Sequence, residues 1–339
     1  MAAAVLFGVS TPFSKILVRQ IEPVLLAGLL YLGSGVGLAT WSGLRRLTGH
    51  NHAEARLTAA DYPWLAGAVV SGGVVAPILL MTGLRLTPAS SASLLLNLEG
   101  VLTALLAWFV FKENFDRRIA LGMTAITMGS LLLSWSGRPH LDVPWGAIAI
   151  AGACFGWAVD NNLTRKVSSG DPLQIAAIKG LVAGSVNVTI ALAFGVRWPG
   201  VYTLTGAALI GFLSYGVSLT LFVLALRHIG TARTGAYFSL APFVGAAIAI
   251  PLLKDSLTIY FFGAAVLMGI GVWLHLTERH EHEHSHDALE HDHWHSHDEH
   301  HRHHDDEALL AEAHSHPHRH KRMRHSHPHY PDIHHRHEH

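Results

Sequence analysis

An apolar run of membrane-spanning length, from Ala89 to Phe111, constrains this chain more than any other feature. A helix needs about 20 consecutive apolar residues to cross a bilayer, so the run predicts a transmembrane span. It ends at the charged pair Lys112-Glu113, which marks the return to water. One carboxylate, Glu99, falls near the middle of the run, where a charge costs at least ~2.5 kcal/mol on insertion scales. Glu99 is therefore a candidate functional residue.

The stretch from Leu84 to Glu113, which contains this run, recurs 142 residues later without a gap, from Leu226 to Asp255. The second apolar run also ends in a base followed by an acid, Lys254-Asp255. Two ends in register around an apolar run are hard to obtain by chance. The body of the protein is therefore predicted to be one unit used twice.

Similar apolar runs follow one another up to residue 276, and short connections with Pro, Gly and charge separate them. This pattern is typical of a polytopic membrane protein and excludes a soluble enzyme with one large core. No glycine loop with Lys-Ser/Thr is found, so we expect neither ATP drive nor an enzyme. Hydropathy predicts ten transmembrane helices, at residues 2–19, 24–44, 62–83, 89–111, 118–136, 144–163, 173–195, 203–225, 232–253 and 258–276.

Five crossings bring the chain to the opposite side of the membrane, so the second copy of a five-helix unit must be inverted. The predicted fold is an all-α membrane protein of two inverted five-helix repeats, residues 1–138 and 139–277. Inverted repeats place a binding site at their interface near the midplane, and rocking of one half alternates access to it. This favours a carrier over a receptor or an anchor. Lys and Arg are more frequent in the connections after even-numbered spans, which predicts that both termini are cytoplasmic.

The remaining segment, residues 278–339, is almost wholly polar and holds 23 of the 28 histidines. Such a cytoplasmic tail cannot bury a core and is predicted to be disordered without metal. Histidines alternate with other residues, and residues two apart share a face of an extended chain, so neighbouring imidazoles can chelate one ion. Imidazole suits nickel, zinc and copper. We expect divalent nickel, cobalt or zinc on the tail, bound by His280, His282, His284, His286, His291, His293, His295, His297, His314, His316, His318 and His320.

The role of the tail stays open at this point. Metal can be the transported cargo, or the tail can buffer or sense metal beside a different cargo. A pH-sensitive solubilising tail is a third reading, because histidine titrates near physiological pH. The first half of the tail is acidic and the second half is basic, which suits contact with anionic lipid.

Glu99, with Asn97 two residues before it, is the first candidate for a proton or cation site. A carboxylate at low dielectric can exchange a proton for a cation, and the alternative is a structural hydrogen bond between helices. The polar run Asp160-Asn161-Asn162 lies late in the sixth span, and Lys179 lies at a similar depth in the seventh. An ion pair between Asp160 and Lys179 is expected, either as a gate or as a fixture of the hairpin.

Lys15 lies in the first span, in a polar segment that also contains Pro12. Pro12 can free a backbone carbonyl that lines a cavity. A base at this depth favours an anionic or zwitterionic substrate, which argues against metal as the cargo. The transport pathway is accordingly predicted to involve Glu99, Asn97, Asp160, Asn161, Asn162, Lys179 and Lys15.

The doubled unit resembles the EamA-type branch of the drug/metabolite transporter superfamily. The resemblance lies in TPASSASLLLNLEGVLTALLAWFVFKE and in its partner GTARTGAYFSLAPFVGAAIAIPLLKD. Family members usually have Pro after the mid-span Glu of the first copy, where this chain has Gly100, while the second copy keeps Pro242. The resemblance implies a ten-helix carrier of the plasma membrane, commonly an exporter driven by an ion gradient. The tail resembles that of bacterial nickel and cobalt resistance permeases.

The leading hypothesis is proton-coupled efflux of divalent transition metal, nickel or cobalt, across a bacterial inner membrane. The alternative is an exporter of amino acids or other small metabolites, with a tail that buffers metal or regulates transport. A membrane-tethered metal-binding protein without transport is a third class, which the repeat argues against. No tightly bound cofactor and no nucleic acid are expected, membrane lipid is the expected surrounding, and a homodimer stays open.

Overall fold

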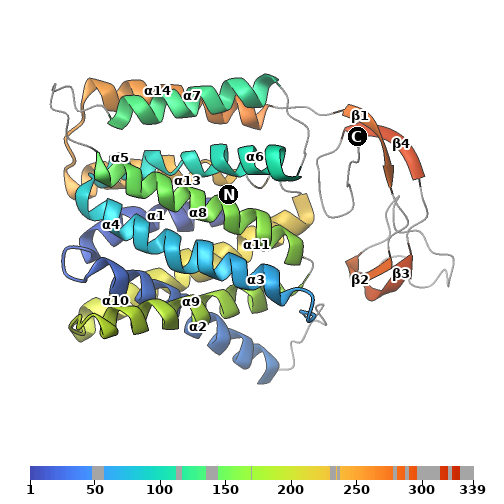
Figure 1. The fold of residues 1–339 in the computed structure, drawn as a ribbon, viewed down its shortest axis with the longest axis horizontal. Helices are drawn as coiled ribbons and strands as arrows, with labels where there is room; N and C mark the ends of the chain where they lie inside the picture. Colours follow the sequence, from blue (N-terminus) through green and yellow to red (C-terminus); the bar gives the residue numbers. More distant parts are fainter. Residues whose placement is uncertain are drawn as a thin grey trace.

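The computed structural model of the chain is a bundle of helices that run roughly side by side, with four short strands at one end (Figure 1). It describes residues 1–47, 57–111, 117–134, 144–168, 170–229, 234, 237–277, 281–286, 290–295, 314–319 and 323–328. The described helices lie within or close to the predicted apolar runs, and most ends are shifted by a few residues; in the run 232–253, α13 begins only at Ala241, and residues 232–233 and 235–236 lie outside the described part of the chain. Their bounds are α1 Ala2–Leu17, α2 Pro23–Leu47, α3 Tyr62–Ala68, α4 Ala76–Leu86, α5 Ala89–Leu95, α6 Leu98–Phe111, α7 Arg117–Ser134, α8 Trp145–Val167, α9 Pro172–Ala193, α10 Val201–Ile210, α11 Ser218–Ile229, α13 Ala241–Leu253 and α14 Ile259–Leu276.

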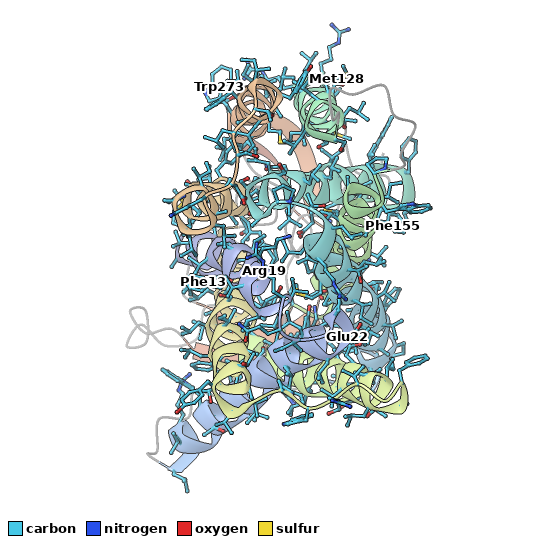
Figure 2. The ribbon with its side chains drawn as sticks, turned by 90° about the vertical axis from the view of Figure 1, so that its left-hand side faces the viewer. Phe13, Arg19, Glu22, Met128, Phe155 and Trp273 are labelled. Atoms are coloured by element: carbon cyan, nitrogen blue, oxygen red, sulfur yellow. The ribbon has the colours of Figure 1, made fainter. Side chains whose placement is uncertain are left out.

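Five helical segments within the described residues are long and apolar enough to cross a membrane. They are Pro23–Arg45, Tyr62–Leu86, Ala89–Val110, Pro172–Ala193 and Val201–Ala225. Large apolar side chains also cover the outside of the bundle. Met128, Phe155 and Trp273 point outward at its rim and are each more than half exposed (Figure 2). An exterior of this kind suits lipid rather than water.

Two of the predicted spans contain a π-helical turn, which the sequence analysis did not anticipate. The segments are η1, Val69–Val75, and η2, Gly211–Val217, so the second begins 142 residues after the first. A π turn leaves the regular hydrogen-bond ladder and is frequent at functional sites. In η1, the Gly72 carbonyl accepts hydrogen bonds from the Tyr31 hydroxyl at 2.7 Å and the Trp157 indole at 3.0 Å. The ladder is therefore completed by side chains from α2 and α8.

The apolar run that contains Glu99 is broken, whereas the sequence predicted one continuous helix over residues 89–111. α5 ends at Leu95 and α6 begins at Leu98. The Glu99 amide donates to the Leu96 carbonyl at 3.0 Å, and the Asn97 amide donates to the Leu94 carbonyl at 3.0 Å. These bonds span three residues instead of four, so the chain is tightened here. The break puts Glu99 in the first turn of α6.

Contacts between helices join the first part of the chain to the second. α2 packs against α9, α7 against α14, and α1 against α13. In Figure 1 the pair α7 and α14 lies at the top and the pair α2 and α9 at the bottom. The backbones of α2 and α9 approach each other at Gly35 and Gly180, where a Cβ on either glycine would overlap the other helix. Small residues permit such close packing between membrane helices.

Four short strands are described within the tail, and the predicted disorder of its other residues lies outside the described part of the chain. The strands are β1 Glu281–His286, β2 Glu290–His295, β3 His314–Arg319 and β4 Met323–Pro328. β1 pairs with β4 and β2 with β3, both antiparallel, so the acidic half of the tail lies against the basic half. Glu290 with Arg319 is the single acid–base pair in these two registers, and most of the other pairs are histidine opposite histidine or involve Ser and Pro.

Candidate functional site

A cavity within the bundle holds about 590 Å³ of empty space, including its opening. Its lining comes from α1, α2, α6, α8, α9, η2 and α11, so both parts of the chain contribute. Polar groups and aromatic rings share the wall. The lining residues are Phe7, Tyr31, Ser34, Glu99, Trp157, Asp160, Asn161, Ala176, Lys179, Gly180, Ser214, Tyr215, Ser218, Leu219, Phe222 and Phe238.

Aromatic rings form a connected wall of this cavity. The ring of Phe7 lies 5.8 Å from Trp157 and from Tyr215, and 5.2 Å from Phe238. Tyr31 continues the wall, with its ring 5.4 Å from that of Tyr215. Pairs at such distances and tilts stabilise one another. The wall is therefore preorganised to contact an apolar or cationic body.

The predicted ion pair between Asp160 and Lys179 is confirmed. The Lys179 ammonium lies 2.6 Å and 2.8 Å from the two Asp160 carboxylate oxygens and 3.1 Å from the Thr164 hydroxyl. The Thr164 hydroxyl also donates to Asp160 at 2.8 Å. Both charged side chains are almost fully buried. All three protons of the ammonium are thus matched by acceptors from the protein.

η1 packs directly against this pair. A Cβ placed on Gly72 would overlap the carboxylate of Asp160. Glycine at this position therefore lets the π-helical backbone lie against the charge. The Gly72 carbonyl also accepts the hydrogen bond of the Trp157 indole. Gly72 therefore positions both the ion pair and part of the aromatic wall.

Glu99 and Asn161 meet across the cavity wall. The Asn161 amide donates to one carboxylate oxygen of Glu99 at 2.8 Å, which joins α8 to α6. Amide donation to a carboxylate favours its orientation toward α8 and leaves the second oxygen for another partner. Of the predicted pathway residues, Glu99, Asp160, Asn161 and Lys179 are thus brought together around one cavity.

Asn97, Asn162 and Lys15 do not line the cavity. Asn97 donates to the Leu94 carbonyl at 3.0 Å, and Asn162 donates to the Ala158 carbonyl at 2.9 Å. Both amides therefore complete backbone hydrogen bonding.

Lys15 lies near the end of α1, beside the end of α4. Its ammonium donates to the carbonyls of Leu84 at 2.6 Å and Thr87 at 2.8 Å. A cation at a helix C-terminus satisfies carbonyls that have no partner within the helix. This contact explains a base at that depth without a substrate, so Lys15 no longer favours an anionic cargo.

The aromatic wall was not predicted from the sequence. Phe7, Trp157 and Phe238 lie in three separate spans, and one aromatic residue in an apolar span carries no distinctive signal. Tyr215 offered a better signal, because it stands between Ser214 and Gly216 in an otherwise apolar run. Small neighbours around a phenol at mid-span indicate close packing around a polar tip.

The described residues contain no group of three or more His, Cys, Asp or Glu side chains able to hold a metal ion. The predicted metal ligands of the tail lie outside the residues whose side chains the structure describes. Backbone register does place histidines opposite histidines in the strands, for example His284 opposite His325 and His293 opposite His316.

Comparison with known proteins gives a consistent picture. The chain matches the EamA-like transporter family twice, over residues 1–135 and 144–277. It is 28% identical over 288 residues to an uncharacterized transporter of Methanothermobacter thermautotrophicus, covering 81% of this chain and 84% of the relative. It is 27% identical over 206 residues to a probable amino-acid metabolite efflux pump of Salmonella typhimurium, covering 56% and 68%. One crystal structure matches with a TM-score of 0.61 and 17% identity over 80% of this chain and 94% of the other, a likeness of fold.

Proposed function

Because the chain belongs to the EamA-like transporter family, we propose that it is a secondary-active exporter of small organic metabolites. The observation that carries this proposal is the aromatic cavity with Glu99 in its wall. A carboxylate at this depth binds a proton or a cationic cargo, and the rings bind an apolar body. The name of the Salmonella relative, an amino-acid metabolite efflux pump, supports an organic cargo.

The transport cycle proposed is alternating access by two inverted five-helix repeats that cross the membrane ten times. Three observations support it. The family matches each half separately, and η1 and η2 begin 142 residues apart. The packing contacts of the two halves are also equivalent. α1 packs on η2 and α13, and its counterpart α8 packs on η1 and α6. Rocking of such halves exposes a central site to each side in turn.

At one end of the bundle a contact joins the two halves. The Asp255 carboxylate accepts from the Ser90 amide at 2.9 Å and from the Ser90 hydroxyl at 2.8 Å, which caps α5. In the proposed cycle this contact breaks when the cavity opens toward this end. With cytoplasmic termini in a bacterial inner membrane, this end faces outward.

Flux through the reconstituted full chain tests the proposal. Liposomes with the protein and a pH gradient are assayed with a panel of radiolabelled amino acids and amines, against protein-free liposomes. We expect gradient-dependent movement of at least one organic solute, and loss of that movement in Glu99→Gln. Asp171→Asn is the matched control, because Asp171 caps α9 outside the cavity and Asn caps a helix equally well. No gradient-dependent flux of any organic solute would contradict the proposal.

Efflux of divalent nickel or cobalt is the second candidate, and the histidine pairs of the tail strands favour it. Cross-strand neighbours lie close enough for two imidazoles to share an ion. Cells with and without the gene are grown on graded nickel and cobalt salts, beside a variant truncated after Thr277. Tolerance that depends on the gene would support metal efflux, and equal tolerance would exclude it.

A further inference from the structure

The charges in the cavity do not balance. Among the described residues of its lining, the acidic and basic side chains are Glu99, Asp160 and Lys179. Asp160 and Lys179 neutralise each other at 2.6 Å. Glu99 accepts a hydrogen bond from the uncharged amide of Asn161, so an ionised Glu99 leaves the described part of the lining with one negative charge. At low dielectric, an unpaired negative charge is unfavourable, and a ligand with one positive charge neutralises it.

Lys179 is not available to a carboxylate on the cargo. Its ammonium already has three acceptors, the two oxygens of Asp160 and the hydroxyl of Thr164. It is 2% exposed, so a carboxylate could reach it only by displacing Asp160. That exchange would leave one buried carboxylate without a partner, which is strongly unfavourable.

The remaining wall suits a cation on an apolar body. The rings of Phe7, Trp157 and Tyr215 pack edge to face on one another and line the same cavity as Glu99. Aromatic faces attract ammonium groups and stack on apolar bodies. The Tyr215 hydroxyl is buried, with the residue 6% exposed, and lies near the Ser10 hydroxyl, which donates to the Phe7 carbonyl at 2.6 Å. It supplies a polar tip to the aromatic wall.

We propose that this cavity selects organic ammonium ions, an amine on an aromatic or aliphatic body without a carboxylate, over amino acids with the same body. The ammonium pairs with the free oxygen of Glu99, the body lies against the aromatic wall, and Tyr215 bonds a polar substituent. This inference rests on the proposed export of organic metabolites and names the class of cargo.

The same charge count defines the exchange. With the ammonium bound, the cavity is neutral, and with a proton on Glu99 and no cargo, it is also neutral. The loaded form carries an ammonium ion out, and the protonated form carries a proton in. One positive charge moves each way, so the exchange responds to a pH gradient and not to membrane potential.

Three compounds with one phenyl body separate the possibilities. Phenethylamine is a cation, L-phenylalanine a zwitterion and hydrocinnamate an anion at neutral pH. Binding to the purified full-length protein is measured by calorimetry, and flux is measured in liposomes against protein-free vesicles. We expect phenethylamine to bind about tenfold or more tightly than L-phenylalanine, because the extra carboxylate has no partner. Hydrocinnamate should not bind.

Variants assign the contacts. Glu99→Gln should abolish phenethylamine binding, and Asp171→Asn, outside the cavity, should leave it unchanged. Tyr215→Phe should reduce binding of tyramine, which carries a hydroxyl, relative to that of phenethylamine. Equal loss for both amines would overturn the role of Tyr215.

The inference and the proposed function fail in different ways. L-phenylalanine bound and carried as well as phenethylamine would overturn the selection of amines, while export of organic metabolites would stand. Failure of every organic compound to bind or move, in folded protein that moves nickel, would overturn both. Phenethylamine flux that stops when membrane potential is clamped would overturn the neutral exchange.

Discussion

The two halves of the bundle share a backbone design but not their chemistry. Each half has a π-helical turn at the same offset, and each has a helix break, at Leu96–Asn97 and at Ser239–Leu240. The carboxylate after the first break, Glu99, has Ala241 as its counterpart 142 residues later. The second half instead supplies Asp160, Lys179 and the phenol of Tyr215. Repeated backbone features thus suit a shared motion, and unrepeated side chains suit recognition of the cargo.

The largest effect on stability is expected at the buried ion pair of the second half. Lys179→Met should leave the buried Asp160 carboxylate unpaired and destabilise the protein by about 3–5 kcal/mol. Thermal unfolding of the detergent-solubilised protein measures the loss. The double variant Lys179→Met with Asp160→Asn should recover much of the stability, because no buried charge remains. A single variant as stable as the native protein would show that the pair is not buried.

The glycines of the two π-helical turns give the next largest contrast. Gly72→Ala should cost about 1–3 kcal/mol, because its methyl group would overlap the Asp160 carboxylate. Gly216→Ala is the matched control in the second half, where the nearest atoms lie at 3.2 Å and 3.3 Å and small shifts can relieve them. Unfolding midpoints of the two variants are compared. Equal losses of stability in the two variants would show that the contact of Gly72 with the ion pair is not the cause of the loss.

Lys15→Met should have the smallest effect. The variant removes a cation from the carbonyl end of α4, a contact worth about 0.3–1 kcal/mol. Relative affinities of the cavity for amines, amino acids and acids should not change, because Lys15 lies outside the lining. Calorimetry with the three phenyl compounds checks this. A changed order of affinities would return Lys15 to the pathway.

The helices and the ion pair could be predicted from the sequence. Hydropathy identifies the spans, and the position of a charged residue along its span indicates which other charges lie at the same depth. Asp160 and Lys179 were predicted to pair on that ground, and they do. The break at Leu96–Asn97 gave no such signal, since leucine favours helices and the irregular turn depends on packing around it. The partners of Lys15 could not be predicted, because they are the backbone carbonyls of Leu84 and Thr87, which no side-chain pattern in the sequence indicates.

The aromatic wall could not be predicted for a related reason. Its rings come from helices far apart in the chain, and the contact of Phe7 with Trp157 depends on how α1 and α8 are packed. The strand pairs of the tail could not be predicted either, because a polar composition argues against a hydrophobic core and says nothing about which segments pair.

Flux driven by a pH gradient in liposomes, with native protein and Glu99→Gln side by side, tests the central claim most directly. Labelled phenethylamine and labelled amino acids serve as cargo, with reconstitution efficiency checked for both proteins. The account predicts that native protein moves an organic cargo when the gradient is imposed and that Glu99→Gln does not. Equal flux through the two proteins would contradict a transport cycle built on the carboxylate of this cavity.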